Sequence, residues 1–396
     1  MHACGLIVEY NPLHNGHVYH IQQAQKLTGC DAMIAIMSGN FTQRGEPAIL
    51  DKFSRTQAAL AAGIDLVVEL PFLYAVQHAD LFAAGAVSIL QALQVDQLVF
   101  GSEEGSIEPF QQALAVQEEH QAAHAHELKM QLELGLSFPE ANRKAYEAIG
   151  LESSLDLTSP NNILGFAYLK AVGKLGASVH VDTIKRVQAG YHEQSISGPI
   201  ASATSIRSAW QDKKKQEVKK AVPDVTLASL ETENLHSWEA YFPLLRYLIL
   251  TRSAEMLRNI QGMEEGLEYR FKKYIAQSTS FQQFLSLIKT KRYTWTRLQR
   301  VCVHLLCNTQ KPTVGPFLQG APYTPYIRVL GMTKKGQAFL ASRKKQLEVP
   351  LYTQLKDGMH PIADLELQAS DAYYSILAPK TAADARRQEI SPPIFT

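Results

Sequence analysis

Cysteines and long apolar runs are scarce in this chain of 396 residues. Its four cysteines, Cys4, Cys30, Cys302 and Cys307, are too few for a disulfide framework. No uninterrupted apolar run reaches the roughly eighteen residues that a membrane-spanning helix needs. The first residues also lack the basic region and apolar block of a secretory signal. We therefore expect a cytoplasmic protein that is not attached to a membrane.

Acidic residues are missing from one long segment. Between Glu268 and Glu348 the chain has no Asp or Glu but carries 15 Lys and Arg residues. Residues 1–268 carry 20 basic and 31 acidic residues, so the overall net charge of +1 hides a strong polarity. A chain polarised in this way usually has a polyanion as its partner.

Strand-like and helix-like sequences alternate over the first hundred residues. The expected strands are Gly5–Tyr10, Ala32–Met37, Leu66–Leu70 and Gln97–Phe100, and the expected helices are His17–Leu27, Lys52–Ala62 and Ala79–Leu93. Short apolar strands between amphipathic helices predict an α/β fold with a Rossmann-like, doubly wound parallel sheet. In such sheets ligands bind beyond the carboxyl ends of the strands.

The strand pattern continues beyond residue 103 and then stops. Ser178–Ile184 has the composition of a further strand, so we expect a nucleotide-binding domain at residues 1–210. Helical periodicity dominates residues 236–310. Because a chain of this length usually forms more than one domain, we expect residues 211–396 to form a mainly helical, basic domain.

A histidine-bearing loop follows the first expected strand. The strand ends at Asn11-Pro12, the tetrad His14-Asn15-Gly16-His17 comes next, and a helix follows at once. In a strand–loop–helix unit the free N–H groups of the helix start point toward an anion. Two imidazoles beside that anion site are protonatable hydrogen-bond donors. The alternative is a surface loop with two exposed histidines.

A second motif favours the anion site. Ser202-Ala203-Thr204-Ser205-Ile206-Arg207 places small hydroxyl residues just before a helix and an arginine on its first turn. Ser202 or Thr204 would cap this helix, and the guanidinium of Arg207 suits phosphate oxygens. Alone, the motif is compatible with an ordinary cap. Together with the histidine loop it predicts a triphosphate site.

The two motifs together resemble a known family. His14-Asn15-Gly16-His17 resembles the HxGH signature of the HIGH nucleotidyltransferase superfamily, and Ser202–Arg207 resembles its second signature. Ala203 departs from that second signature, which often has a hydroxyl residue there. Four longer stretches resemble the bacterial tRNA(Met) cytidine acetate ligases more narrowly: Val8–Pro12, Met37–Ala48, Asp65–Pro71 and Phe100–Glu103. The resemblance extends over essentially the whole chain.

The resemblance implies an ATP-dependent, AMP-forming carbon–nitrogen ligase. Such an enzyme activates acetate as acetyl-adenylate and releases pyrophosphate. It then transfers the acetyl group to N4 of the wobble cytidine of elongator tRNA(Met), forming N4-acetylcytidine. Mg²⁺ would accompany ATP, held mostly through phosphate oxygens and water, and we expect no metal site made by protein residues. ATP, acetate and elongator tRNA(Met) are the implied partners, and we infer no obligatory protein partner.

The resemblance also implies roles for individual residues. His14 and His17 would hold the α- and β-phosphates, and Thr204, Ser205 and Arg207 would hold the β- and γ-phosphates. His14, His17 and Arg207 are the implied catalytic residues. Gly101, Asn162, Arg186 and Val187 would line the adenosine side. The full set of implied ATP contacts is Ile7, Val8, Glu9, Tyr10, Asn11, Pro12, Leu13, His14, Asn15, Gly16, His17, His20, Gly101, Asn162, Arg186, Val187, Thr204 and Ser205.

The acid-free segment predicts an RNA surface without any resemblance. Its stretch 291–300 mixes aromatic residues with Lys291, Arg292, Arg297 and Arg300, which we expect to bind tRNA. Its aromatic residues, Tyr293 and Trp295, either stack on bases or pack in the core. We also hypothesise, from their place after the second strand, that Gln43 and Arg44 position acetate or cytidine.

Three alternatives remain at this point. The chain could be an adenylyltransferase that acts on a small phosphate-bearing metabolite, although such a substrate does not explain the basic segment. It could also be a non-catalytic RNA-binding protein, although the intact motifs argue against that. Cys302-Val303-His304-Leu305-Leu306-Cys307 could suggest a zinc site, but its spacing favours buried core cysteines.

Overall fold

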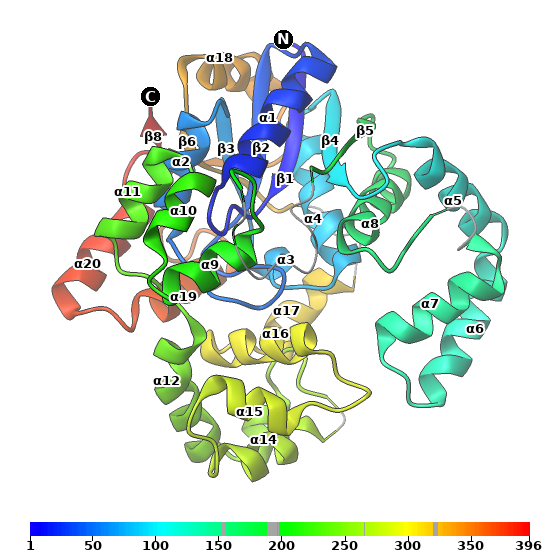
Figure 1. The fold of residues 1–396 in the computed structure, drawn as a ribbon, viewed down its shortest axis with the longest axis vertical. Helices are drawn as coiled ribbons and strands as arrows, with labels where there is room; N and C mark the ends of the chain where they lie inside the picture. Colours follow the sequence, from blue (N-terminus) through cyan, green and yellow to red (C-terminus); the bar gives the residue numbers. More distant parts are fainter. Residues whose placement is uncertain (152–154, 188–195, 197, 265, 320–323) are drawn as a thin grey trace.

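One sheet of eight strands forms the centre of the molecule (Figure 1). The computed structural model describes residues 1–151, 155–187, 196, 198–264, 266–319 and 324–396. The strand order is β5-β4-β1-β2-β3-β6-β7, and β8 pairs with β6. The first five strands are β1 (Ala3–Val8), β2 (Ala32–Ser38), β3 (Leu66–Leu70), β4 (Gln97–Ser102) and β5 (His180–Lys185). They pair in parallel, as the sequence predicted.

Helices cover both faces of these parallel strands. On one face α1 (Asn15–Thr28) and α2 (Lys52–Ala61) pack in a small core with alternate residues of β1 and β2. On the other face lie α3 (Phe72–Ala75), α4 (Ala79–Ala92) and α8 (Pro160–Leu175), which belong to the main core. Every residue of β2 and β3 is buried, as expected for central strands that are covered on both sides. The expected Rossmann-like fold is confirmed.

The expectation that no strand follows residue 210 is wrong. The strand β6 (Ile327–Met332) pairs antiparallel with β3. The short strands β7 (Leu351–Tyr352) and β8 (Ile394–Phe395) pair parallel with β6. The sheet is therefore mixed, and the last seventy or so residues return to it. The helices α18 (Lys334–Arg343), α19 (Pro361–Tyr374) and α20 (Pro379–Arg387) belong to this returning part.

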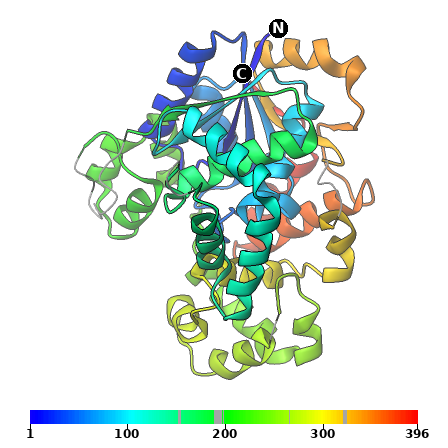
Figure 2. The same ribbon diagram turned by 90° about the vertical axis from the view of Figure 1, so that its right-hand side faces the viewer.

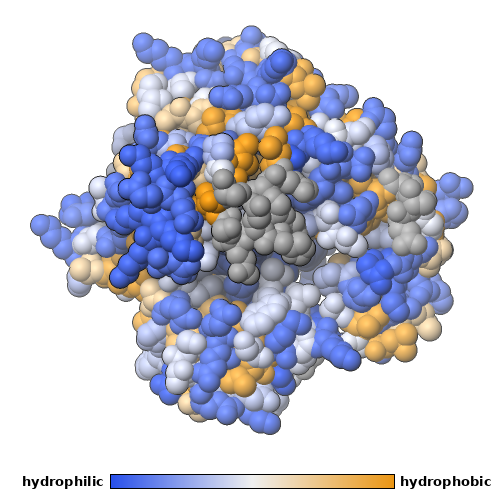
Figure 3. Space-filling view, viewed as in Figure 1, coloured by the Kyte–Doolittle hydropathy of each residue, from blue (hydrophilic) through white to orange (hydrophobic). Residues whose placement is uncertain are grey.

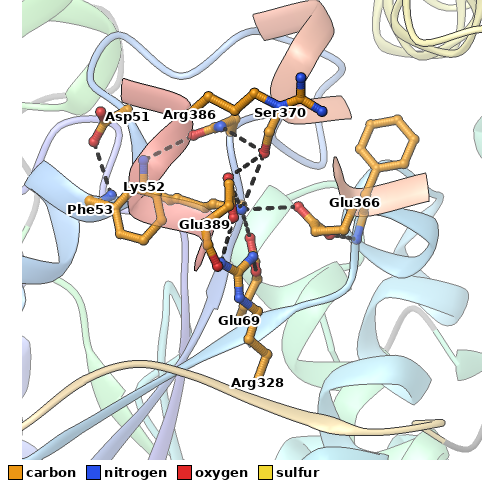
Figure 4. A network of polar contacts seen from close by, with 12 residues as sticks. Asp51, Lys52, Phe53, Glu69, Arg328, Glu366, Ser370, Arg386 and Glu389 are labelled. Atoms are coloured by element: carbon orange, nitrogen blue, oxygen red, sulfur yellow. Dashed lines mark hydrogen bonds and ion pairs between the residues drawn. The ribbon is translucent and has the colours of Figure 1, made fainter. Parts of the chain in front are cut away.

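A buried ionic network fastens the returning segment to the sheet (Figure 4). The ammonium of Lys52, on α2, lies 2.7 Å from Glu69, 2.9 Å from Glu389 and 3.5 Å from Glu366. Arg328, on β6, pairs with Glu69 and Glu389 as well. All five side chains are at most 2% exposed. Two cations thus face three carboxyl groups in the interior.

Two helical parts project from the sheet on either side of a gap. The helices α5 (Glu108–Glu119), α6 (Gln121–Glu133) and α7 (Phe138–Ala148) form an arm beside α8. Figures 1 and 2 both show a second group, coloured lime to yellow, below the sheet. This group contains α12 (Trp238–Thr251), α13 (Ala254–Arg258), α14 (Leu267–Ile275), α15 (Phe281–Ile288), α16 (Trp295–Leu306) and α17 (Lys311–Leu318). The segment between the sheet and that group forms α9 (Ala203–Gln211), α10 (Lys215–Ala221) and α11 (Asp224–Thr232).

The structure agrees with the sequence on the state of the cysteines and on the lack of a long apolar helix in the described ranges. All four cysteines are free and buried, so the core assignment of Cys302 and Cys307 is confirmed. Within the described ranges, no helix is both long and apolar enough to cross a bilayer.

Candidate functional site

A single large cleft brings both sequence motifs together. It encloses about 1900 Å³ and is lined by the carboxyl ends of β1, β4 and β5, the starts of α1, α9 and α16, and part of α7. Figure 3 shows the surface hollowed between the upper body, the lower helices and the helices on the right. The cleft lies where the fold predicts a ligand site, beyond the carboxyl ends of the parallel strands.

The histidine tetrad forms the first turn of α1. His14 is the N-cap residue, and its Nδ1 accepts the N–H of Gly16 at 3.1 Å. The Nδ1 of His17 accepts the N–H of His14 at 3.3 Å, and the two rings stack with centroids 3.7 Å apart. A Cβ on Gly16 would lie 3.0 Å from the His14 ring, so glycine permits this close approach. The local sequence therefore orients both rings through their own helix start.

The imidazoles are neutral in the free protein. Burial, followed by the charges of Arg186 and Arg207, lowers the pKa of His14 to about 3. Burial, His14 and Arg186 lower the pKa of His17 well below its usual value. Burial and Arg186 lower the pKa of His20 to about 4. Because Nδ1 of His14 and of His17 accepts a backbone N–H, the ring proton of each is on Nε2. The two rings therefore present neutral Nε2–H donors, and a bound anion would raise their pKa and make them easier to protonate.

The second motif forms the start of α9. The Ser202 hydroxyl caps the helix by accepting the N–H of Ser205 at 3.0 Å, which confirms the cap. Thr204 is exposed, whereas the Ser205 hydroxyl is turned back to the Ser202 carbonyl at 2.9 Å. Arg207 donates to the Asn11 carbonyl at 2.8 Å and pairs with Glu46 at 2.9 Å. Arg207 thus ties α9 to the loop that precedes the histidine tetrad.

Most of the predicted ATP contacts line the cleft. They include residues from the end of β1, the histidine tetrad, the ends of β4 and β5, and α9: Ile7, Val8, Glu9, Tyr10, Asn11, His14, Gly16, His17, His20, Gly101, Arg186, Val187, Thr204 and Ser205. A Cβ on Gly101 would lie 3.2 Å from the Arg186 side chain, so this glycine leaves room between β4 and β5. Their contact with ATP stays a prediction.

Four of the predicted ATP contacts stabilise the loops instead of lining the cleft. Pro12 and Leu13 are buried behind it. Asn15 donates to the carbonyls of Pro199 and Lys220, at 2.9 and 3.0 Å. Asn162 is buried, and its Oδ1 accepts the N–H groups of Glu103 and Glu104 at 3.1 and 3.2 Å.

Three of the four predicted RNA contacts line the same cleft. These are Arg292, Arg297 and Arg300, whereas Lys291 is exposed and lies outside the lining. Arg297 pairs with Glu264 at 3.0 Å. Arg300 is largely enclosed and donates to the Gln43 carbonyl at 3.2 Å, and burial lowers its pKa to about 10. The acid-free segment thus contacts the loop after β2 inside the cleft.

The two aromatic residues of stretch 291–300 differ in exposure. Tyr293 is 6% exposed and packs in the core, whereas Trp295 is 41% exposed. Stacking on RNA therefore stays available to Trp295.

The loop after β2 joins the two halves of the site. Gln43 and Arg44 both line the cleft. Gly45 has a left-handed backbone (φ +75°), and a Cβ there would meet the backbone of α16 at Gln299 and Arg300. The indole of Trp238, on α12, donates to the Gly45 carbonyl at 2.8 Å.

Several cleft residues were missed by sequence reasoning. Glu46 lies inside the Met37–Ala48 stretch that carried the resemblance, and that position was the only signal for it. Gln77, Phe138 and His304 also line the cleft, and nothing in their local sequence indicated this. They come from three separate elements that only the tertiary fold brings together.

A metal site made by protein side chains alone is not seen in the part of the chain that the structure describes, where no three His, Cys, Asp or Glu residues cluster suitably. The cleft does contain the carboxylates of Glu9, Glu46 and Glu103. These oxygens suit outer contacts to a hydrated Mg²⁺ whose inner ligands are phosphate oxygens.

Comparisons with known proteins agree with this geometry. The family model described as HIGH nucleotidyl transferase matches residues 1–389. A tRNA(Met) cytidine acetate ligase of Oceanobacillus iheyensis is 47% identical and covers 100% of both chains. Its counterpart in Bacillus subtilis is 45% identical over 94% of this chain and 92% of its own.

A solved structure is similar over the same length. It is the crystal structure of Thermotoga maritima TmcAL bound with alpha-thio ATP, with a TM-score of 0.90, 33% identity and 100% coverage of both chains. An apo form of that protein has a TM-score of 0.91. The chain therefore belongs to the HIGH nucleotidyl transferase family and, within it, to the tRNA(Met) cytidine acetate ligases.

Proposed function

We propose that this protein is an ATP-dependent ligase that activates acetate and acetylates N4 of the wobble cytidine of elongator tRNA(Met). One observation carries the proposal. The starts of α1 and α9, which bear His17 and Arg207, line the same cleft as the cationic start of α16. A nucleotide triphosphate and an RNA strand can therefore meet in one place. The full-length likeness to the ligases supports the same conclusion.

The first step is adenylation of acetate. A carboxylate oxygen of acetate attacks the α-phosphorus of ATP, the α–β phosphoanhydride bond breaks, and pyrophosphate leaves. Negative charge accumulates on phosphate oxygens during this exchange. The Nε2–H groups of His14 and His17 would stabilise it at the start of α1. Arg207 and the exposed Thr204 hydroxyl would hold the outer phosphates at α9, as would Ser205 if its hydroxyl turned away from Ser202. Mg²⁺ would neutralise further phosphate charge from its hydrated shell.

The second step is acetyl transfer. The N4 nitrogen of cytidine attacks the carbonyl carbon of acetyl-adenylate and forms the C–N bond. The bond from that carbon to the AMP phosphate oxygen breaks, AMP leaves as an anion, and the N4 proton is released. Both reactants must be held together, because orientation supplies much of the acceleration in such a transfer.

Binding of tRNA belongs to the helical part in this proposal. The acid-free segment contributes Arg292, Arg297 and Arg300 to the cleft wall, and Lys291 and Trp295 to the surface beside it. We propose residues 211–396 as the tRNA-binding part, although β6 to β8 within it complete the catalytic sheet. An enzyme that uses ATP and tRNA would act in the cytoplasm.

A pyrophosphate assay with the purified full chain tests the proposal. Acetate-dependent exchange of labelled pyrophosphate into ATP, followed by AMP formation only when elongator tRNA(Met) is added, is the expected pattern. Exchange that needs a phosphorylated metabolite instead of acetate would identify an adenylyltransferase. No exchange with any carboxylate would leave only RNA binding.

A further inference from the structure

One lobe of the cleft has unpaired hydrogen-bonding groups at its floor. It lies between α16, the turn from α3 to α4, and the first residue of α7. His304 on α16 and Gln77 in the turn both line the cleft, although they are only 2% and 6% exposed. Over the described residues, Nδ1 of His304 and Nε2 of Gln77 have no hydrogen-bond partner. Buried polar atoms without a partner are uncommon and call for an explanation.

The chemistry of these two atoms is fixed by their surroundings. Nε2 of His304 lies 3.1 Å from the Val76 carbonyl, which can only accept, so Nε2 carries the ring proton. Burial lowers the pKa of His304 to about 3, so the ring is neutral and Nδ1 is a bare acceptor. The amide nitrogen of Gln77 is a donor. The lobe thus contains one bare acceptor and one free donor: Gln77 directly follows Val76, whose carbonyl binds His304, and both side chains line the same cleft.

A third group and a stacking surface complete the lobe. Arg300 precedes His304 by one helical turn, and the only hydrogen bond of its guanidinium to a described residue is to the Gln43 carbonyl. The other N–H groups of the Arg300 guanidinium can therefore donate to a ligand. Phe138 is 42% exposed in the same cleft, and its ring centroid lies 6.5 Å from that of His78, the residue after Gln77. An exposed aromatic ring of this kind is a stacking platform for a nucleobase.

The lobe is joined to the nucleotide end of the cleft by a short series of contacts. Arg300 binds the Gln43 carbonyl at 3.2 Å, and the Gln43 N–H binds the Glu9 carboxylate at 2.6 Å. Glu9 directly follows β1 and precedes the histidine loop. Arg300, one helical turn before His304, is thus connected through Gln43 to the end of β1, where the acyl-adenylate forms in the proposed reaction.

We propose that this lobe is the pocket for the acceptor base, with His304 and Gln77 reading its edge and Phe138 stacking on its ring. The inference rests on the proposed function. Cytosine matches the three groups: its N4 amine donates to an acceptor such as Nδ1 of His304, while its N3 and O2 accept from Gln77 and Arg300. Uracil has a carbonyl in place of the amine and an N3–H in place of the acceptor. It would leave Nδ1 of His304 unpaired and oppose one donor with another.

The test uses the full chain with transcripts of elongator tRNA(Met) that carry cytidine or uridine at the acceptor position. Acetyl transfer, the binding ratio of the two transcripts, and acetate-dependent pyrophosphate exchange are measured for three variants. Gln77→Met and His304→Phe remove the edge contacts, and Phe138→Ala removes the stacking ring from an exposed position where folding is not at risk. Gln91→Met is the control, because Gln91 also has a buried amide atom without a partner among the described residues but lies outside the cleft.

The pocket predicts different effects on the three measurements. Edge variants should lower kcat/KM for tRNA about 10- to 100-fold and bring the cytidine-to-uridine binding ratio toward one. Phe138→Ala should lower kcat/KM by about 5- to 150-fold with little change in that ratio. Exchange should stay within about twofold of the wild type in the variants that fold, and Gln91→Met should match the wild type in every assay.

Two results would overturn the pocket. One is wild-type transfer and an unchanged binding ratio in Gln77→Met together with wild-type transfer in Phe138→Ala. The other is a raised KM for ATP in the exchange reaction, which would make the lobe part of the nucleotide site. Both differ from failure of the proposed function, which would appear as absent acetate-dependent exchange in the wild-type protein.

Discussion

Replacement of Lys52 by methionine removes a buried charge at little change in side-chain volume, and we expect it to lower the free energy of unfolding strongly. The ammonium of Lys52 lies within 3.5 Å of three carboxyl groups, and the side chains involved are at most 2% exposed. The variant leaves Arg328 as the only cation facing Glu69, Glu366 and Glu389 in the described network. Breaking a buried ion pair by removing one partner costs about 3–5 kcal/mol.

The cost should also depend on pH. Lys52 lowers the pKa of Glu366 and of Glu389 in the folded protein, so its removal raises the pKa of both. The folded variant then binds protons that the folded wild type does not, and its stability relative to the wild type rises as the pH falls. We therefore expect the full cost near pH 8 and a smaller cost near pH 6.

Urea unfolding of the wild type, Lys52→Met and a control at both pH values measures this. The control is Lys129→Met, because Lys129 and Glu133 are 78% and 62% exposed and lie 4.0 Å apart on one helix. That pair is worth about 0.3–0.5 kcal/mol. A cost for Lys52→Met below about 1 kcal/mol at pH 8, or one that is the same at pH 6, would refute the reasoning.

Three further predictions concern the same network, the RNA surface and the β2 loop. Burial and Glu69 raise the pKa of Glu366 to about 8, so the folded state holds a proton that the unfolded state loses near pH 4.5, and stability falls as the pH rises through this window. Glu366→Gln should flatten that decline in urea titrations at pH 5 to 8, and an unchanged slope would contradict it. Arg297→Glu should weaken tRNA binding and lower its salt slope, by about 0.7–0.9 per lost phosphate contact, while exchange persists. Lys380→Glu, an equal charge change on exposed α20, should leave binding unaltered, and equal losses in both variants would argue against a local contact. Gly45→Ala should cost about 2–5 kcal/mol through left-handed strain and a clash with α16, against about 1–2 for Gly29→Ala, which has φ +59° and open space. Equal costs for the two glycines would mean that α16 does not constrain the loop.

The parallel half of the sheet could be predicted because its signal is local. Each of the first strands is a short apolar run next to an amphipathic helix, and the observed bounds agree with the expected ones within two or three residues. The two motifs were equally local, since each is a helix start whose cap and His or Arg side chains are close together in the chain.

The strand β6 could not be predicted in the same way. It contains Arg328, and a charged residue within an acid-free segment indicates an exposed surface. The buried partners of this arginine, Glu69 and Glu389, lie 259 and 61 residues away. Without knowledge of these partners, the sequence gives no reason to bury the charge.

Inside the site, the sequence likewise could not predict which way individual side chains point. Asn162 and Arg300 were expected to face ligands. Asn162 is buried outside the cleft lining and holds the loop after β4, whereas Arg300 lines the cleft and also holds the loop after β2. In both cases the partner is a backbone group distant in sequence, which neither helical periodicity nor capping rules reveal.

The central claim is that the first turn of α1 binds the phosphates that react with acetate. Acetate-dependent exchange of labelled pyrophosphate into ATP by His17→Ala, compared with the wild type, tests it most directly. Loss of a donor that stabilises transition-state charge typically lowers the rate about 10²- to 10³-fold. We predict a loss of this size in exchange, with tRNA binding retained. Exchange at the wild-type rate in a folded His17→Ala protein would contradict the account.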